Sequence, residues 1–425
     1  MTDIRPSRTG VEAASGTAML CRACGAAVRH TVIDLGMSPL CESYVASENL
    51  DQMEPFYPLR VFVCERCFLV QLREYVSAES IFGDYAYFSS YSNSWLRHAE
   101  EYVAMAAARF GLGPKSRVVE LASNDGYLLQ FFVRAGIPAL GVEPAANVAK
   151  AAEERGVETL VAFFSPEIAH RLRSEGWAAD LLVGNNVLAQ VPDLNGFVAG
   201  MKLVLAEHGV ITLEFPHVER MIEENQFDTI YHEHFSYFSL ASATFLLARH
   251  ELTVFDVEEL ATHGGSLRIY ARHADDTSHP VTARVGALRG REEQLGVHTL
   301  AYYSDFAERV KETKRALLDF LVQAKRDGKR IVGYGAPGKG NTLLNYCGIR
   351  TDFVEFTVDR NPHKQGKFLP GTHIPIYPPA KLEDARPDFV LILPWNLRDE
   401  IVKQLAVVRT WGGRFVVPIP ALRVW

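Results

Sequence analysis

Residues 117–144 read RVVELASNDGYLLQFFVRAGIPALGVEP, and their pattern decides the fold. Two short apolar runs enclose a polar turn and a longer segment that has no helix-breaking residue before Gly136. This order predicts a strand over 117–121, a helix over 127–135 and a second strand over 139–142. Strand, helix and strand in this succession are typical of an α/β fold with a parallel sheet.

The alternation continues towards the C-terminus. Further apolar runs that we expect to be strands lie at 159–161, 180–183 and 209–214. The middle of the chain is therefore predicted to hold a parallel, doubly wound sheet. Two more candidate strands follow at 252–257 and 267–270, and the region 284–326 is expected to be one long helical stretch.

A second α/β pattern begins with Ile331-Val-Gly-Tyr-Gly335, an apolar run that enters a Gly-rich turn over 335–340 and then a helix. Expected strands follow at 353–358, 389–393 and 414–417. Where such a turn opens a helix, its backbone N–H groups suit a diphosphate. It is not a Walker motif, because Lys339 is not followed by Ser or Thr, and a plain strand–helix turn is the alternative.

The composition is that of a globular protein. The 425 residues are 48% hydrophobic and 22% charged, which rules out disorder for most of the chain and suggests about three domains. No apolar stretch approaches the ~20 residues that a membrane helix needs. The net charge of −7 and the lack of a basic stripe argue against a protein that grips nucleic acid.

Four of the six cysteines form two Cys-x-x-Cys pairs, namely Cys21 with Cys24 and Cys64 with Cys67. Each pair places two thiolates on one tight turn, and two pairs complete a tetrahedral zinc shell. We expect this zinc to be structural, because four thiolates leave no open position. Cys41 and Cys347 are expected to be small buried residues. Residues 1–17 lack the apolar core of a signal peptide, so we expect a cytoplasmic protein with reduced thiols.

The turn over 122–126 indicates the cofactor of the first α/β unit. It is not the G-x-G-x-x-G of a pyrophosphate binder, and acidic and amide side chains line it instead. Such a turn suits a cationic ligand that carries an amino acid, and Glu143 after the second strand could bind both hydroxyls of a ribose. Together these features point to S-adenosylmethionine. A capped helix start with a surface glutamate is the alternative.

Several motifs occur in one order along the chain: the two Cys-x-x-Cys pairs, 123–126, 141–144, 227–234, 263–265 and 333–336. In this order they resemble the sugar C-methyltransferases of antibiotic and cell-surface deoxysugar pathways. The resemblance implies S-adenosylmethionine-dependent methylation at C3 of a nucleotide-linked 4-keto-deoxysugar, through an enolate. It also implies a small N-terminal zinc-binding domain, a middle Rossmann-like methyltransferase domain and a C-terminal Rossmann-like domain.

On this basis we expect a leader over 1–18, a zinc-binding domain over 19–82, an S-adenosylmethionine-binding methyltransferase domain over 83–275, a helical connector over 276–328 and a Rossmann-like substrate domain over 329–425. The expected partner is a nucleotide sugar, linked to thymidine diphosphate, that binds a monomeric enzyme. No nucleic acid or membrane partner is expected.

Enolate formation needs a base and a donor for the developing oxyanion. The segment 227–239 is dense in aromatic and ionisable side chains. By resemblance, Tyr231, Glu233 and His234 match the active-site triplet, in which His234 is the base, Glu233 orients it and Tyr231 donates to the enolate oxygen. His232 is expected to be a bystander. Judged without the resemblance, a loop whose histidines satisfy core hydrogen bonds is the alternative.

The resemblance also implies contact residues. The family tyrosine near the methyl donor corresponds to Tyr87, with Tyr85 as the alternative. The expected cofactor contacts are Ser123, Asn124, Asp125, Gly126, Glu143, Pro144, Phe163 and Asn185. The expected substrate contacts are His263, Gly264, Tyr334, Lys339 and Asn341. The segment 83–94, rich in tyrosines and hydroxyls, is either a packed loop or a lid over a ligand.

One departure from the family pattern concerns Gln190, which stands where the family often has a histidine and which cannot act as a base. Three other functions are weighed against the one above. They are an oxidoreductase that holds NAD at the turn after Ile331, a zinc-ribbon scaffold that binds nucleic acid or protein, and a methyltransferase acting on oxygen or nitrogen.

Overall fold

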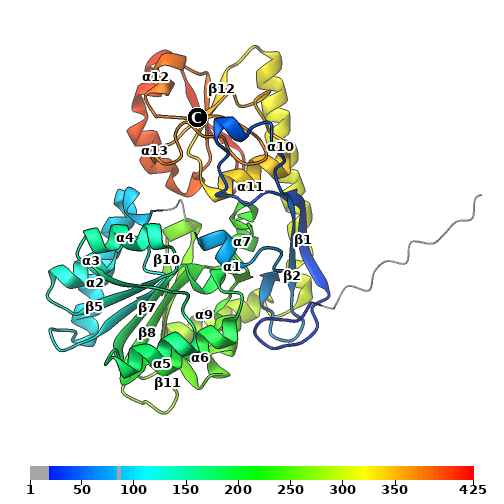
Figure 1. Cartoon of the computed structure of the whole chain (residues 1–425). Helices are drawn as coiled ribbons and strands as arrows, with labels where there is room; N and C mark the ends of the chain where they lie inside the picture. Colours follow the sequence, from blue (N-terminus) through cyan, green and yellow to red (C-terminus); the bar gives the residue numbers. More distant parts are fainter. Residues whose placement is uncertain (1–18, 84–87) are drawn as a thin grey trace, which may run out of the picture.

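The structure is a computed structural model that describes residues 19–83 and 88–425. The expected leader and both candidate tyrosines, Tyr85 and Tyr87, lie outside the described residues. The described strands form three sheets, which Figure 1 shows as an N-terminal unit, a middle unit and a C-terminal unit. Within the described ranges, no helix combines the length and the apolarity that crossing a bilayer requires.

The N-terminal sheet has its strands in the order β1-β2-β3-β9. They are β1 (His30–Ser38), β2 (Tyr57–Val63), β3 (Val70–Leu72) and β9 (Ser236–Tyr237). All neighbours are antiparallel, and Val70 lies opposite Tyr237. Strand β9 comes from the centre of the chain, directly after the residues that the sequence predicts to be catalytic. The N-terminal sheet is therefore completed by a strand of the middle unit.

The middle sheet has seven strands in the order β10-β11-β8-β7-β4-β5-β6. They are β4 (Val118–Leu121), β5 (Ala139–Glu143), β6 (Glu158–Val161), β7 (Ala179–Asn185), β8 (Leu205–Pro216), β10 (Leu252–Leu260) and β11 (Ser266–His273). Strands β4 to β8 are parallel, as the sequence predicts, whereas β11 runs antiparallel to β8 and β10. The short turn between β10 and β11 permits only the antiparallel arrangement, because parallel strands need a long crossover.

The C-terminal sheet has the order β14-β13-β12-β15-β16-β17. Its strands are β12 (Ile331–Tyr334), β13 (Thr357–Val358), β14 (Ile376–Tyr377), β15 (Phe389–Ile392), β16 (Arg414–Val417) and β17 (Arg423–Val424). Its five parallel strands follow the same spatial order as β4 to β8, which makes the two α/β units topologically alike. The strand expected over 353–358 is present only at its last two residues, because the N–H groups of Phe353 and Val354 bond to Arg350 O in a turn.

Helices cover both faces of the middle sheet (Figure 1). One face carries α2 (Asn93–Phe110), α3 (Leu129–Arg134) and α4 (Ala146–Glu154), and the other carries α5 (Pro166–Ser174), α6 (Leu194–Val204) and α8 (Leu240–Ala248). The remaining helices are α1 (Ala78–Phe82), α7 (Val218–Glu223), α9 (Ala283–Leu295), α10 (Phe306–Arg326), α11 (Gly338–Cys347), α12 (Lys381–Ala385) and α13 (Arg398–Gln404). The long helical stretch expected over 284–326 is two helices, because Gly296 ends α9 with a left-handed φ of 77°.

One continuous hydrophobic core joins the N-terminal sheet to the C-terminal unit. It contains Val61 of β2, Leu317 of α10 and Val332 of β12. In Figure 1 the long yellow helix α10 runs beside both the β1–β2 hairpin and the C-terminal unit. The metal-binding cysteines, in contrast, pack with the core of the middle unit. The domain boundaries given above stay a prediction.

Candidate functional site

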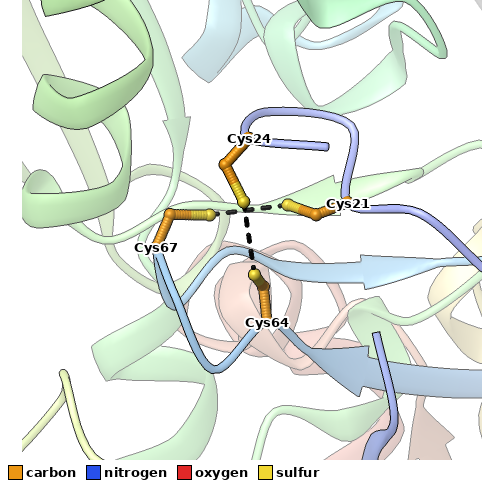
Figure 2. A group of neighbouring side chains, drawn as sticks. All are labelled: Cys21, Cys24, Cys64 and Cys67. Carbon is orange, nitrogen blue, oxygen red and sulfur yellow. Dashed lines mark hydrogen bonds between the residues drawn. The ribbon is translucent and has the colours of Figure 1, made fainter. Parts of the chain in front are cut away.

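Four thiols converge in the N-terminal unit (Figure 2). Their sulfur atoms all lie within 4.8 Å of one another, and the pairs Cys21–Cys67 and Cys24–Cys64 are each 3.5 Å apart. A tetrahedral zinc ion with Zn–S bonds of about 2.3 Å would place its sulfurs roughly 3.8 Å apart. The thiols therefore fit zinc, and all four are used, which leaves no position for a substrate.

The two Cys-x-x-Cys turns have the same backbone. The N–H of Gly25 donates to Cys21 O, and the N–H of Phe68 donates to Cys64 O, both at 2.9 Å. Gly25 and Phe68 have left-handed φ values of 73° and 55°. That conformation costs little for glycine but is unfavourable for phenylalanine. A bound metal would hold both turns in this form.

The metal site is hydrogen-bonded to the segment that the sequence predicts to be catalytic. Gln71 Nε2 donates to Cys21 Sγ at 3.3 Å, and Gln71 lies opposite Ser236 in the β3–β9 pair. One residue further on, the N–H of Leu72 donates to Phe235 O at 2.9 Å. The zinc turns and the residues that follow His234 are therefore held together by the same sheet.

A cavity of about 920 Å³ lies between the three units. Of the predicted cofactor and substrate residues and the catalytic triplet, its wall contains Asn124, Glu143, Pro144, Phe163, Asn185, Tyr231, Glu233, His234, His263, Tyr334 and Lys339. The predicted residues that are not part of the wall are Ser123, Asp125, Gly126, Gly264 and Asn341. Most of the predicted set is thus brought together from stretches that lie far apart in the sequence.

The turn after β4 shapes the cofactor end of the cavity. Ala122, Asn124 and Gly126 have φ values of 54°, 51° and 73°. The N–H of Asn124 donates to Glu143 Oε2 and the N–H of Ala145 donates to Glu143 Oε1, both at 2.9 Å. These bonds fix the carboxylate at the end of β5. Burial raises the pKa of Glu143 to about 7.

The polar and apolar groups at the cofactor end of the cavity fit S-adenosylmethionine. The Glu143 carboxylate lies where a ribose is bound in comparable α/β folds. Asn185 Oδ1 is buried, and within the described part of the chain it has no hydrogen-bond partner, so it is available to a ligand N–H group. Phe163 and Pro144 add apolar surface to the same wall, which suits an adenine ring.

Asp125 is used inside the protein rather than in the cavity. Its Oδ2 accepts hydrogen bonds from the N–H of Ser90, at 3.3 Å, and from the Ser90 hydroxyl, and it lies 3.5 Å from Arg155 Nη1. These contacts tie the described part of the segment 83–94 to the cofactor turn. Because Ser89 lines the cavity, this part of the segment is a packed wall of the site.

His234 is held in one tautomer. Its Nδ1–H donates to Thr229 O at 2.9 Å, which leaves Nε2 as the acceptor nitrogen of the neutral ring. The rings of Tyr231 and His234 lie 4.1 Å apart between centroids. Burial lowers the pKa of His234 to about 4. His232 does not line the cavity, and its Nε2 lies 3.2 Å from Pro58 O.

Cys41 contacts the predicted catalytic triplet. Its thiol donates to Glu233 Oε1 at 3.3 Å, and burial raises the pKa of this thiol well above its usual range, so the proton stays on sulfur. Asn341 Nδ2 donates to Cys41 O at 2.6 Å. Asn341 therefore joins α11 to the N-terminal unit instead of lining the cavity. Cys41 is buried, as expected, but the sequence gives no sign of its contact with Glu233.

The His-Gly-Gly turn brings the middle unit against the C-terminal unit. His263, Gly264 and Gly265 all have left-handed φ values, of 54°, 93° and 122°. A Cβ at Gly264 would lie 2.5 Å from the Trp395 ring, so only glycine fits there. His263 faces the cavity, and its Nε2 lies 3.2 Å from Asn186 Nδ2. Gly264 thus permits the close approach that positions His263.

The Gly-rich turn of the C-terminal unit is partly covered. The N–H of Ala336 donates to Asp359 Oδ2 at 2.7 Å, and the Tyr44 hydroxyl donates to Ala336 O at 2.5 Å. A Cβ at Gly338 would lie 2.8 Å from Cys41 Sγ. Gly335, Pro337, Gly338 and Lys339 still line the cavity, but the N–H of Ala336 is already bound within the protein, which counts against an NAD-dependent oxidoreductase.

Several wall residues were not predicted from the sequence. His98 of α2 lines the cavity, and its Nε2 lies 2.9 Å from Glu214 Oε2, which also accepts from Arg268 Nη2 at 2.8 Å. Although burial opposes it, the contacts with His98 and Arg268 lower the pKa of Glu214 to about 2. No motif links these residues in the sequence, since each stands alone in its element. Gln190, the departure noted above, lines the cavity as well.

Three family models match consecutive parts of the chain. They describe a zinc binding domain over residues 21–82, a methyltransferase domain over 95–257 and a C-methyltransferase C-terminal domain over 261–420. Two solved structures are also similar in part. The magnesium protoporphyrin IX methyltransferase of Synechocystis is 14% identical with a TM-score of 0.32, covering 42% of this chain and 79% of its own. An S-adenosylmethionine-dependent methyltransferase of Anabaena variabilis is 14% identical with a TM-score of 0.34, covering 45% and 87%.

TM-scores this low carry no argument about the site or the reaction. A curated relative gives a far more extensive match. The C-methyltransferase NovU of Streptomyces niveus is 37% identical over 404 residues, which are 95% of this chain and 96% of NovU. The match spans the zinc turns, the cofactor turn and the cavity wall together. The chain therefore belongs to the C-methyltransferase family and is an S-adenosylmethionine-dependent enzyme with an N-terminal zinc-binding unit.

Proposed function

We propose that this enzyme transfers a methyl group to C3 of a nucleotide-linked 4-keto-deoxysugar. The observation that carries the proposal is the acceptor nitrogen of His234, which is fixed by the hydrogen bond from Nδ1 to Thr229 O. His234 lines the same cavity as Glu143 of the cofactor end and Tyr334 of the C-terminal unit. Methylation at carbon needs a carbon nucleophile, and the carbon beside a ketone becomes one when a base removes its proton. A neutral imidazole in the cavity provides that base.

Each of these cavity residues has its own role in the proposed reaction. His234 Nε2 takes the C3 proton. Burial raises the pKa of Tyr231 well above its usual range, so its hydroxyl stays protonated and can donate to the ketone oxygen. Glu233, which accepts a hydrogen bond from the Cys41 thiol, orients the base. When bound at the Glu143 end, S-adenosylmethionine supplies an electrophilic methyl group.

The proposal extends to the finer features of the substrate. The C-terminal unit supplies Tyr334 and Arg360 to the wall. We assign the nucleotide to that side, with thymidine diphosphate as its carrier, and we place the reaction in deoxysugar biosynthesis for a natural product. The volume of about 920 Å³ is within the range of cavities that bind ligands of this size. The enzyme is proposed to act as a monomer.

The proposal is tested by incubating the enzyme with a panel of thymidine and uridine diphosphate-linked 4-keto-deoxysugars. With S-adenosylmethionine, mass spectrometry should detect one added methyl group, located at C3 by NMR. Without the methyl donor, the C3 hydrogen should exchange with deuterium from the solvent. A methyl group found on oxygen or nitrogen, with no exchange at C3, would contradict the proposal in favour of a heteroatom methyltransferase.

The affinity for S-adenosylmethionine should depend on pH through Glu143. Ribose hydroxyls donate best to an ionised carboxylate, and the pKa of Glu143 is raised to about 7 by burial. As the pH falls below this value the ionised fraction declines, so the dissociation constant should rise about tenfold per pH unit. Calorimetry over a pH series that brackets neutrality measures this rise, and Glu143→Gln should bind weakly at every pH.

The exposed Glu153→Gln variant of α4 is the matched control and should behave as the wild type. A wild-type affinity that does not change with pH would show that Glu143 does not contact the ribose.

A further inference from the structure

Lys339 is a cation in the reaction cavity without a paired carboxylate. Its Nζ donates to Asn396 Oδ1 at 2.9 Å and lies 4.9 Å from the centroid of the Trp395 ring. Both partners are uncharged, and among the described residues no carboxylate lies within ion-pair distance of this nitrogen. Burial lowers the pKa of Lys339, and the nearby Asp228 carboxylate opposes that shift and favours the ammonium. A part-buried charge with so few partners is costly unless a ligand completes its surroundings. The ammonium still has N–H groups to give to an anionic oxygen.

The lysine is held firmly between two units. The Trp395 ring that supports it donates from Nε1 to Asp228 Oδ2 at 2.7 Å. Asp228 directly precedes Thr229, whose carbonyl holds His234. The same ring also lies against Gly264, where a side chain would not fit. The position of the ammonium relative to the base is therefore fixed by direct contacts on both sides.

The cavity that Lys339 lines is the one that contains the His234 base. Lys339, His234 and His263 all line the same cavity. Burial lowers the pKa values of both histidines, and the charge of Lys339 adds to the effect on each ring. Gly335, Pro337 and Gly338 of the Gly-rich turn line the cavity too, but the N–H of Ala336 is already bound by Asp359 and is not free for a diphosphate.

We propose that Lys339 is a catalytic residue whose ammonium stabilises the negative charge that develops on the ketone oxygen of the sugar. This inference rests on the proposed function. The C3–H bond breaks, the proton passes to His234 Nε2, and the electron pair moves to form the C3–C4 double bond and a negative C4 oxygen. That oxygen accepts hydrogen bonds from Lys339 and Tyr231. C3 then bonds to the methyl carbon as the bond between that carbon and the donor sulfur breaks, C4 returns to a ketone, and the ammonium is unchanged.

The test uses Lys339→Met, which keeps an unbranched side chain one atom shorter and removes its charge. Lys314→Met is the matched control, since Lys314 also donates to an uncharged oxygen, Tyr346 O at 2.6 Å, and lies 4.7 Å from a ring centroid, but outside the cavity wall. The readouts are the dissociation constants for thymidine diphosphate and for S-adenosylmethionine, and the rate of C3 deuterium exchange of a saturating thymidine diphosphate-linked 4-keto-6-deoxyhexose without methyl donor.

Lys339→Met should slow exchange by roughly 100-fold or more, as removal of an oxyanion donor does, while both dissociation constants change less than about threefold. Lys314→Met should match the wild type. A thymidine diphosphate affinity that falls tenfold, with normal exchange at saturation, would overturn the proposal and make Lys339 a phosphate ligand. Loss of S-adenosylmethionine binding in Lys339→Met would indicate misfolding. In that case the exchange rate and the two dissociation constants are measured for Lys339→Gln instead, and the same outcomes support or overturn the proposal. Failure of the wild type to exchange C3 would reject the proposed function instead.

Discussion

Replacing His234 by glutamine should lower the rate of methyl transfer by roughly 10²–10⁴-fold, which is the usual contribution of a general base. Glutamine fills a similar volume but offers no nitrogen that can take a proton. S-adenosylmethionine should bind with unchanged affinity, because His234 is hydrogen-bonded to Thr229 and takes no part in the contacts that hold Glu143. Deuterium exchange at C3, followed without methyl donor, should be lost together with methyl transfer. Exchange measured by NMR and binding measured by calorimetry separate the two effects.

His232→Gln is the matched control for this experiment. His232 is two residues away and buried, but it lies outside the cavity wall, so its replacement should leave exchange near the wild-type rate. The pH profile gives a second check. Because burial lowers the pKa of His234 to about 4, the ring is neutral at higher pH and acts as a base there. With saturating cofactor, kcat should stay flat from roughly pH 5 to pH 8 and fall only in stronger acid. An unchanged exchange rate in His234→Gln would reject His234 as the base.

Removing the zinc ion should abolish most of the activity, although the metal site is outside the cavity wall. Zinc holds the Cys-x-x-Cys turns, and Cys21 is bonded through Gln71 to the β3–β9 pair that ends the catalytic segment. Loss of this support leaves His234 and Glu233 poorly positioned, and misplacement by about 1 Å can cost roughly 100-fold in rate. The variant Cys64→Ser should therefore lose its zinc, measured by atomic emission, and its methyl transfer.

The same variant should also be less stable. A structural zinc site contributes several kcal/mol to folding, so we expect the Tm to fall by roughly 10 °C. S-adenosylmethionine should still bind, because Glu143 and Asn185 belong to the middle unit. Cys347→Ser, which changes a buried thiol that is not a ligand, is the control for the loss of a cysteine. A zinc-free enzyme with normal kcat would show that the β3–β9 pair holds its geometry without the metal.

The parts of the fold that follow from short-range pattern could be predicted. Residues 117–144 give strand, helix and strand because their hydrophobic runs and turn residues act locally. The zinc ligands could be paired for the same reason, since each Cys-x-x-Cys lies on one turn. The break at Gly296 was missed because a glycine inside a charged, helical pattern carries a weak local signal.

The long-range parts could not be predicted. Cys41 and Glu233 are 192 residues apart, and nothing in the sequence around either one indicates their hydrogen bond. The pairing of Ser236–Tyr237 with β3 was not predicted either, because so short a strand is defined by its partner rather than by its own sequence pattern. Asn341 was expected, by resemblance, to contact the substrate, but the direction of its side chain depends on the N-terminal unit that packs there.

The completion of the N-terminal sheet by β9 has a consequence for how these enzymes can be recombined. A hybrid that takes residues 19–82 from one relative and the remainder from another would join strands that were never selected to pair, at Val70–Tyr237 and Gln71–Ser236. The unit of exchange is therefore discontinuous, consisting of the zinc turns together with residues 231–237 and the α11 surface that Cys41 touches. Altering substrate preference by gene shuffling requires crossovers that keep these three segments from a single parent.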